Sequence, residues 1–463
     1  MILSGSCTHL KPAEHAGPGV TVPETYSLYG ETSATPDRWW EEFQSEELDA
    51  LIDEALADNL AVKQAYARLG QAEAIAVKAG APRYPDLALV AGISETRRNI
   101  TDGQLVDRTV TDSFKDMSLV SSYEVDLWGR ISSTHKSALL GVEATREDLY
   151  TSAVTLTSEV AIRWLAIISV RNQLELIRSQ IEINRTTLEL INLRYLKGVG
   201  TALDVYQQRL ALAESLSLIP PLEALEQTLM NELAVLLGKP PQSELSLASD
   251  NLPELEGLPE AGLPADLLSQ RPDVRAAGLE LKAAEWDVTA ARAARLPAIR
   301  LSAEAGFSAG TFPLLFENWL ARLAGSLTAP LFKGGELDAE VERQRQIVEE
   351  RLAVYGQVVL IAIREVEDAM VNEQKQVEFL AALGERLNIA RQNHHEALQR
   401  YRKGLNDYLP VLSALIAVQR LERDIVLARF DRLNYRVQLY RALGGTWMGT
   451  ELELARERPD GES

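Results

Sequence analysis

Two stretches of the chain lack proline for much longer than an ordinary helix requires. No proline occurs over residues 86–219 or 331–409. Because proline interrupts helix interiors, these windows predict long helices, which we place at 130–196 and 335–402. Each helix would extend about 100 Å at 1.5 Å per residue. A single globular core cannot cover such a length, so the helices are expected to pack side by side.

An apolar stripe in the second window repeats in steps of four, four and three residues. Its members are Leu337, Val341, Val348, Leu352, Tyr355, Val359, Ile363, Val366 and Met370, with Gln344 as the one polar interruption. An eleven-residue period gives nearly straight helices with a slight right-handed supercoil, which suits the wall of a wide tube. An ordinary coiled-coil rod explains the stripe equally well.

Four shorter segments alternate with a period of two, which is typical of strands. Their apolar or small positions are Leu87, Leu89, Ala91 and Ile93, then Met117, Leu119, Ser121, Tyr123 and Val125, then Ile299, Leu301, Ala303, Ala305 and Phe307, and finally Trp319, Ala321, Leu323, Gly325 and Leu327. Each run has about ten residues, the length of a tilted membrane-spanning strand. We therefore predict strand pairs within 86–126 and 298–331, joined by loops at 99–113 and 308–318.

Four strands are too few to close a barrel, and an open sheet edge is not tolerated in lipid. If these strands span a membrane, several chains must share one barrel. Three chains would supply twelve strands. The pattern as a whole predicts a mixed α+β membrane protein with long helices.

The sequence is internally duplicated. RYLKGVGTALDV (194–205) matches RYRKGLNDYLPV (400–411), and VDLWGR (125–130) parallels APLFKG (329–334). VLLGK (235–239) parallels RALGG (441–445) at nearly the same offset. We divide the chain into a leader and lipid tether at 1–37, a first repeat at 38–250, a second repeat at 251–447, and a tail at 448–463.

Each repeat is expected to contain a helix, a strand pair, a long helix, a tip and a return helix. The tips are placed at 197–203 and 403–409. The shorter helices are placed at 46–80, 203–238, 272–296 and 410–443. Pro220 and Pro221 lie inside one of them and should kink it.

Glycines mark the predicted tips and the bends between strand and helix. In the tips, Gly198, Gly200 and Gly404 suit helix C-cap positions that require positive φ. Candidate N-caps of the returning helices are Thr201 or Asp204 and Asn406 or Asp407, with Pro410 in a first turn. Helix capping alone would explain these tip residues. At the bends the candidates are Trp128 and Gly129, then Pro330, Gly334 and Gly335; Trp128 is either an interfacial indole or a plain core aromatic.

Composition narrows the function. The formal net charge of −20 argues against nucleic-acid binding, which needs clustered Lys and Arg. No run approaches 18 consecutive apolar residues, which argues against a transmembrane helix. The one cysteine, Cys7, excludes an intramolecular disulfide and follows Leu3-Ser4-Gly5-Ser6, a run that resembles a bacterial lipobox. We expect Cys7 to be lipidated, although the charged and apolar regions of a complete leader are missing.

Catalytic and cofactor signatures are absent from the sequence. There is no GxSxG, P-loop or complete GxGxxG motif. The adjacent histidines His394 and His395 lack carboxylate or thiol partners at ligand spacing, so a solvated helix surface is favoured over a metal site. We therefore predict no enzyme activity, no cofactor and no metal.

Several ordered segments together resemble the outer membrane factor family, a TolC-like family, and its NodT-like efflux branch. They are PDRWWEEFQSEELDALIDEAL (36–56), SYEVDLWGR (122–130), IPPLEALEQTLMNELAVLLGKPP (219–241), LLSQRPDVRAAGLELKAAEWDVTAARAARLPAI (267–299), APLFKGGEL (329–337), IREVEDAM (363–370) and YRALGGTW (440–447). The resemblance covers about residues 36–447. It implies a homotrimer with a twelve-stranded barrel in outer-membrane lipid and a helical α-barrel in the periplasm.

The resemblance also implies partners and sites. A periplasmic adaptor, joined to an inner-membrane pump, would contact the tip residues Lys197, Gly198, Val199, Gly200, Thr201, Lys403, Gly404, Leu405, Asn406 and Asp407. The pore constriction would involve Leu409, Ser413 and Asp407, with Ser413 in place of the acidic residue usual in that branch.

The function expected from the resemblance is the passive outer-membrane conduit of a tripartite efflux system that exports small molecules. The alternatives are the outer component of type I protein secretion and a structural periplasmic coiled-coil protein without a barrel. The four alternating strands count against the last of these.

Overall fold

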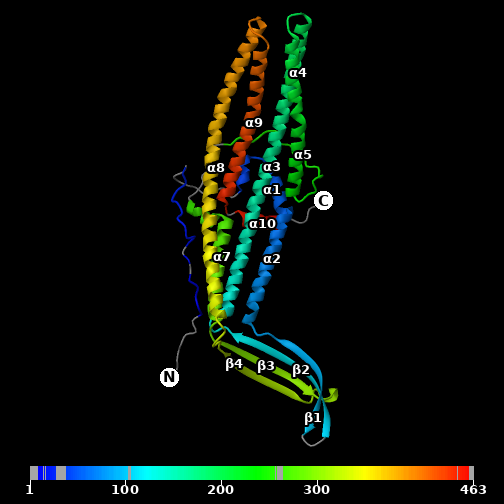
Figure 1. The fold of residues 1–463 in the computed structure, drawn as a ribbon, viewed down its shortest axis with the longest axis vertical. Coiled ribbons are helices and arrows are strands. Elements are labelled where there is room, and N and C mark those ends of the chain that lie inside the picture. Colours follow the sequence, from blue (N-terminus) through cyan, green and yellow to red (C-terminus); the bar gives the residue numbers. More distant parts are fainter. Residues whose placement is uncertain are drawn as a thin grey trace. The chain divides into compact units, whose positions relative to one another are not determined.

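The computed structural model describes residues 9–13, 15, 17–27, 38–102, 106–255, 257, 264–445 and 447–457. The described part is mainly helical, with one antiparallel sheet (Figure 1). The helices are α1 (Glu46–Asp58), α2 (Leu60–Gly80), α3 (Arg130–Leu196), α4 (Ala202–Ser217), α5 (Ile219–Leu236), α6 (Leu267–Gln270), α7 (Pro272–Ala293), α8 (Glu336–Arg402), α9 (Leu409–Leu443) and α10 (Met448–Glu457). The strands are β1 (Ala88–Asp102), β2 (Val106–Val125), β3 (Ala298–Ala309) and β4 (Trp319–Thr328). Four short 3₁₀ turns complete the order: η1 (Trp39–Phe43), η2 (Ala81–Arg83), η3 (Pro264–Asp266) and η4 (Phe312–Leu314).

The chain forms two compact units, and both draw on each of the predicted repeats. The unit with the strands, here called the sheet unit, comprises Met1–Gly19, Arg68–Arg146 and Ala276–Gly356. The other, here called the tip unit, comprises Val20–Ala67, Glu147–Arg275 and Gln357–Ser463. The division into two repeats stays a prediction about the sequence, since the contacts group the residues differently.

The sheet follows chain order, β1-β2-β3-β4, with every neighbouring pair antiparallel. β3 and β4 have 12 and 10 residues, close to the expected ten, whereas β1 and β2 have 15 and 20. Much of the loop predicted at 99–113 is therefore strand. Its polar residues hid it from a pattern based on alternation, yet the backbone pairing continues to Asp102↔Val106.

The α7 and α8 segments of the sheet unit pack face to face (Figure 1). Leu281 and Ala284 of α7 contact Val348 of α8, and Tyr355 packs against this cluster. Gly278 of α7 lies beside the Tyr355 ring, and a Cβ there would be in ordinary contact with the ring at 3.5 Å. The stripe predicted along α8 therefore faces a neighbouring helix here.

The core of the tip unit is rich in aromatic side chains. Trp39 stacks on Tyr440 of α9 at a centroid distance of 5.4 Å, and Trp40 meets Trp447 edge to face at 4.9 Å. Trp39 and Trp40 are 1% and 0% exposed. Buried aromatics contribute large apolar areas, so this cluster anchors the chain before α1 and after α9 to one another.

Part of α3 is apolar enough in length and composition to pass as a membrane span. However, 72% of the 18-residue window concerned is buried inside the protein. Packing within the tip unit includes its side chains Trp164, Leu165, Ile167 and Ile168, all 0–1% exposed. The apolar character is thus that of a core helix.

The return helix of the first half is broken, as Pro220 and Pro221 predicted. α4 ends at Ser217 and α5 begins at Ile219, with Leu218 between them. The second half has no such break, because α9 runs for 35 residues from Leu409.

Candidate functional site

One face of the sheet is apolar over the half nearer the helices, whereas Lys115 and Glu95 occupy it farther out. The cross-strand rows Leu89↔Leu119↔Ala305↔Ala321 and Met117↔Phe307↔Trp319 collect the alternating positions on that face. Its large side chains are open, with exposures of 67% for Leu89, 74% for Trp319 and 82% for Leu323. An exposed apolar patch of this kind marks an interaction surface.

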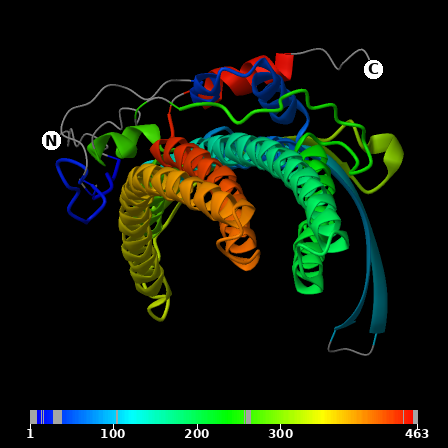
Figure 2. The same cartoon turned by 90° about the horizontal axis from the view of Figure 1, so that it is seen from above.

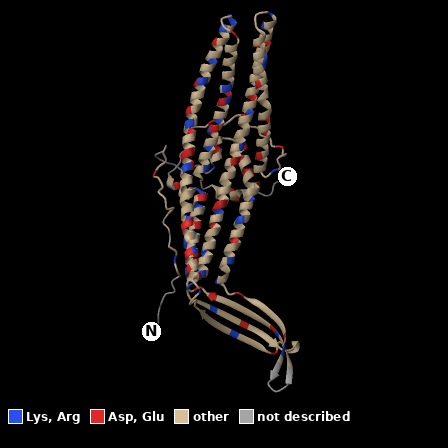
Figure 3. Cartoon of the chain, in the orientation of Figure 1, with Lys and Arg blue, Asp and Glu red and all other residues tan. Residues whose placement is uncertain are grey.

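The opposite face of the sheet is polar. It carries Glu124, Arg300, Glu304 and Arg322, with Arg300 Nε 3.5 Å from the Glu124 carboxylate. Figure 3 shows that charged residues are sparse on the strands and more frequent along the helices. One apolar and one polar face is the arrangement of a sheet between lipid and water.

The glycines of the two strand-to-helix bends have positive φ. Gly129 has φ +77°, and Gly334 and Gly335 have φ +60° and +85°. The half-buried Trp128 donates its indole N–H to the Pro297 carbonyl at 2.8 Å, which ties the first bend to the start of β3. Pro330 precedes the second bend within an exposed segment.

Asp126 is a functional residue of the first bend that the sequence reasoning missed. Its carboxylate accepts the backbone N–H groups of Ile131 at 3.0 Å and Ser132 at 2.8 Å. Although burial opposes ionisation, hydrogen bonds from Ser132 and Ile131 lower the Asp126 pKa. The sequence signal that could have predicted this cap is an acidic residue just before the long helix, because negative charge is stabilising at a helix N-terminus.

Both tips begin with the same helix-ending motif. After α3, Gly198 N–H bonds to the Tyr195 carbonyl at 2.9 Å and Val199 N–H to the Arg194 carbonyl at 2.9 Å. After α8, Gly404 and Leu405 repeat these two bonds at 3.0 and 2.9 Å. This is the Schellman pattern, which needs a left-handed residue. Gly198 and Gly404 supply φ +77° and +72°.

Two details of the tips differ from expectation, at Gly200 and at the start of α9, while the N-cap of α4 is one of the two expected candidates. Gly200 does not adopt positive φ, because the first turn needs a left-handed residue only at Gly198. Thr201 caps α4 in a reciprocal capping box with Asp204. Neither Asn406 nor Asp407 caps α9, whose N-cap Tyr408 makes no side-chain cap bond.

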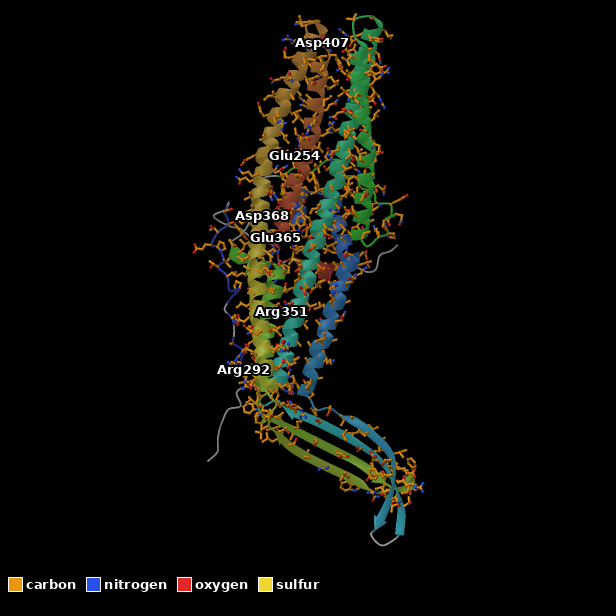
Figure 4. The ribbon with its side chains drawn as sticks, in the orientation of Figure 1. Glu254, Arg292, Arg351, Glu365, Asp368 and Asp407 are labelled. Atoms are coloured by element: carbon orange, nitrogen blue, oxygen red, sulfur yellow. The ribbon has the colours of Figure 1, made fainter. Side chains whose placement is uncertain are left out.

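Neighbouring residues explain the missing cap at α9. The Asn406 amide donates to the Asp407 carbonyl at 3.2 Å instead, and Pro410 lies in the first turn as predicted, where a missing N–H costs nothing. Figure 4 places the Asp407 side chain at the turn between α8 and α9.

The expected adaptor-contacting residues of the tips are mostly open. Lys197, Gly198, Val199, Thr201, Lys403, Gly404, Leu405 and Asp407 are exposed, while Gly200 and Asn406 are half-buried. Leu196, Val199 and Leu405 are 80%, 65% and 63% exposed. Each tip therefore offers an apolar side chain beside a lysine.

The two hairpins are joined just behind the tips by buried polar side chains that the sequence reasoning missed. Tyr408 of α9 is 2% exposed and donates its hydroxyl to Gln208 Oε1 of α4 at 2.5 Å. Gln208 Nε2 in turn donates to the Asn184 carbonyl of α3 at 2.9 Å. Burial raises the Tyr408 pKa, which keeps the phenol neutral and able to donate. Figure 2 shows the two hairpins side by side.

The residues expected at a pore constriction share one surface. Leu409 and Ser413 are exposed one turn apart on α9, with Leu409 at 53% exposure, while Val411 and Leu412 between them are buried. Asp407 is exposed in the turn before them. Leu409 and Ser413 therefore face away from the hairpin core.

A buried ion pair joins α8 and α9 farther along the tip unit. The side chains of Arg436 and Glu373 are 2% and 0% exposed, and Arg436 Nη2 lies 2.7 Å from Glu373 Oε1. The same Nη2 donates to the Gly257 carbonyl at 2.8 Å, and Arg432 lies 3.9 Å from Glu373. Glu373 follows Met370 by three residues and so continues the apolar stripe of α8. An acidic residue at such a position was the sequence signal that could have predicted a buried ion pair.

Cys7, the expected lipidation site, lies outside the described residues. Among the residues that the structure does describe, no group of three His, Cys, Asp or Glu side chains is placed to hold a metal ion.

Comparison with known proteins identifies the family. A family model described as outer membrane efflux protein matches residues 51–239 and 263–445. The chain belongs to this family. The pyoverdine export outer membrane protein OpmQ of Pseudomonas aeruginosa is 33% identical over 98% of this chain and 97% of that protein. The toluene efflux pump outer membrane protein TtgF of Pseudomonas putida is 32% identical over 77% of this chain and 75% of that protein.

A solved outer-membrane channel has the same fold. The structure of OprN superposes with a TM-score of 0.86 and 27% identity over 93% of this chain and 99% of that one. The predicted TolC-like α+β fold is thereby confirmed. The chain is the outer-membrane channel component of an efflux system, as predicted, in a family of conduits. A strandless coiled-coil rod is inconsistent with the sheet.

Proposed function

We propose that three copies of the chain close their sheets into one barrel of twelve strands in the outer membrane. The observation that carries the proposal is a sheet with one exposed apolar face and strands β1 and β4 at its two edges. Because lipid cannot satisfy the backbone groups of an open edge, each β1 is expected to pair with β4 of the next copy. The polar face would then line a water-filled lumen.

Within this trimer the helices form a passive conduit across the periplasm. An inner-membrane pump supplies the energy, and a periplasmic adaptor docks on the tips. The efflux names of the relatives support export of small organic solutes over type I protein secretion. Leu409, Ser413 and Asp407 form the narrowest part of the channel, near the tips. The Tyr408–Gln208 hydrogen bond holds the two hairpins of one chain together while the channel is closed. The chain is anchored through lipid on Cys7, which loss of palmitate label in Cys7→Ser would test.

The mass and conductance of detergent-extracted protein test the barrel. We expect a particle of three 51.1 kDa chains that conducts ions stepwise in planar bilayers. Leu323→Arg should reduce membrane-inserted trimer strongly, since an arginine on the lipid face costs about 2–4 kcal/mol at mid-membrane. Ser326→Arg, on the polar face of the same strand, is the matched control and should insert normally. A stable monomer, or equal insertion of both variants, would contradict the proposal.

The tip glycines test adaptor docking. Gly198→Val and Gly404→Val should leave trimer yield unchanged, because no atom lies within 4 Å of a Cβ at either site. The left-handed backbone is nevertheless disfavoured by about 1 kcal/mol, which reshapes the turn. Site-specific cross-linking to the adaptor should fall about fivefold, the equivalent of that energy, and drug sensitivity should rise.

A control variant separates docking from backbone strain. Gly334→Val imposes the same strain at φ +60°, also in open space, but in the sheet unit. It should leave adaptor cross-linking unchanged. Normal export by both tip variants would show that the adaptor binds elsewhere.

A further inference from the structure

A half-open pocket of about 690 Å³ lies in the sheet unit beside the first bend. The N-terminal segment 9–12 forms one wall of the pocket, and the first turns of α3 form another. α7 contributes one aromatic ring. The lining residues are His9, Leu10, Lys11, Pro12, Ser132, Ser133, Lys136 and Trp286.

The pocket is basic within an acidic protein. None of its eight lining residues is an Asp or Glu, although the chain has 67 acidic residues against 47 basic ones. The exposed side chains of Lys11 and Lys136 make no ion pair among the described residues. An ammonium offers three hydrogen-bond donors, and two lysines line this one pocket.

Trp286 positions one of these lysines. Lys136 Nζ lies 4.2 Å from the centroid of the Trp286 ring, a cation–π geometry that holds the ammonium at the pocket wall. Ser132 and Ser133 of α3 complete this wall, with the Ser132 side chain hydrogen-bonded to Asp126. The carboxylate of Asp126, at the first bend, accepts the backbone N–H groups of Ile131 and Ser132.

The N-terminal wall of the pocket contacts the bend that follows β2. Leu10 N–H donates to the Trp128 carbonyl at 3.4 Å, and a Cβ at Gly129 would lie 3.1 Å from the His9 ring. Trp128 follows β2 by three residues. A pocket at this place lies where the apolar face of the sheet ends, which is the level of lipid headgroups if that face is in lipid.

We propose that this pocket binds a phosphate group, with Lys11 and Lys136 as its cationic ligands. The phosphate could be carried by an anionic phospholipid or by a soluble phosphorylated molecule. Trp286 would cover the glycerol or other carbon-rich part next to the phosphate. Only the choice of the lipid as source rests on the proposed membrane position of the sheet.

Native mass spectrometry of the intact detergent-extracted protein tests the site. Phosphatidylglycerol and, separately, inorganic phosphate and glycerol phosphate are titrated as probes. The double variant Lys11→Gln/Lys136→Gln should weaken binding about 25-fold, from a contribution of about fivefold per lysine near an anionic headgroup. Lys333→Gln, at the second bend of the same unit, is the matched control and should bind as the unchanged protein does.

The probes separate the sources. Lysine-dependent binding of phosphatidylglycerol that 10-fold excess inorganic phosphate does not displace supports the lipid site. Lysine-dependent binding of the soluble probes, with no lysine-dependent binding of phosphatidylglycerol, supports a soluble phosphate ligand. Equal binding by the double variant and the control, or no binding of any probe, overturns the proposal. Each result is independent of conductance, so a failure here leaves the channel function untouched.

Discussion

Replacing Glu373 by leucine should destabilise the tip unit by about 3 kcal/mol, because the buried Arg436 guanidinium then keeps only the more distant Glu42, 3.8 Å from its Nη1, as a counter-charge. Burial opposes the charge of Arg436, yet the hydrogen bonds and charge of Glu373 raise its pKa. Arginine stays protonated in any case. The expected result is a clear fall in the urea midpoint of the detergent-extracted protein.

Two further variants make the Glu373 measurement specific. Glu373→Leu/Arg436→Met removes both charges and should recover most of the loss, since apolar replacement of a whole buried pair is often neutral. Glu378→Leu breaks the exposed pair with Lys375, whose Nζ lies 2.8 Å from the carboxylate, and should change stability by less than about 0.5 kcal/mol. Equal midpoints for the Glu373 and Glu378 variants would show that the buried pair does not hold α8 to α9.

Gly238→Ala should destabilise the tip unit by about 2–4 kcal/mol, far more than alanine at either tip glycine. Gly238 ends α5 in the same Schellman pattern, with φ +73° and the Lys239 N–H bonded to the Ala234 carbonyl at 2.8 Å. A Cβ there would lie 2.5 Å from the Asp58 carbonyl oxygen, and backbone cannot yield as a side chain can. The clash adds about 1–3 kcal/mol to the conformational cost of about 1 kcal/mol.

Gly404→Ala is the matched control for that substitution. Its backbone has nearly the same φ, +72°, but no atom lies within 4 Å of the added carbon. Urea unfolding should therefore separate the two variants, with only the conformational cost lost at Gly404. A similar loss in both would mean that α5 shifts away from Asp58 at little cost.

The sequence predicted helices and strands best where apolar positions recur with a simple period or where prolines set the ends of a helix. Proline-free windows set α3 and α8, and alternation with period two located the apolar face of the sheet. Polar residues such as Arg98 and Asp112 hid the outer part of β1 and β2. They pair across the hairpin at 2.5 Å, an interaction that no periodicity signals.

Tertiary contacts between distant residues could not be predicted in the same way. Glu373 and Arg436 are 63 positions apart, and Tyr408 and Gln208 are 200 apart. Each pair depends on which helix faces cross, and a single sequence does not specify that. The tip glycines were predictable for the opposite reason, because a Schellman turn is decided within six neighbouring residues.

The break at Leu218 makes the two hairpins mechanically different. Pro220 and Pro221 have no N–H to continue the helical ladder, so α4 can tilt on α5 with few hydrogen bonds to lose. α9 is one uninterrupted helix of 35 residues, so bending it requires breaking backbone hydrogen bonds. A force applied to both tips would therefore bend the first hairpin at Leu218 more readily than the second.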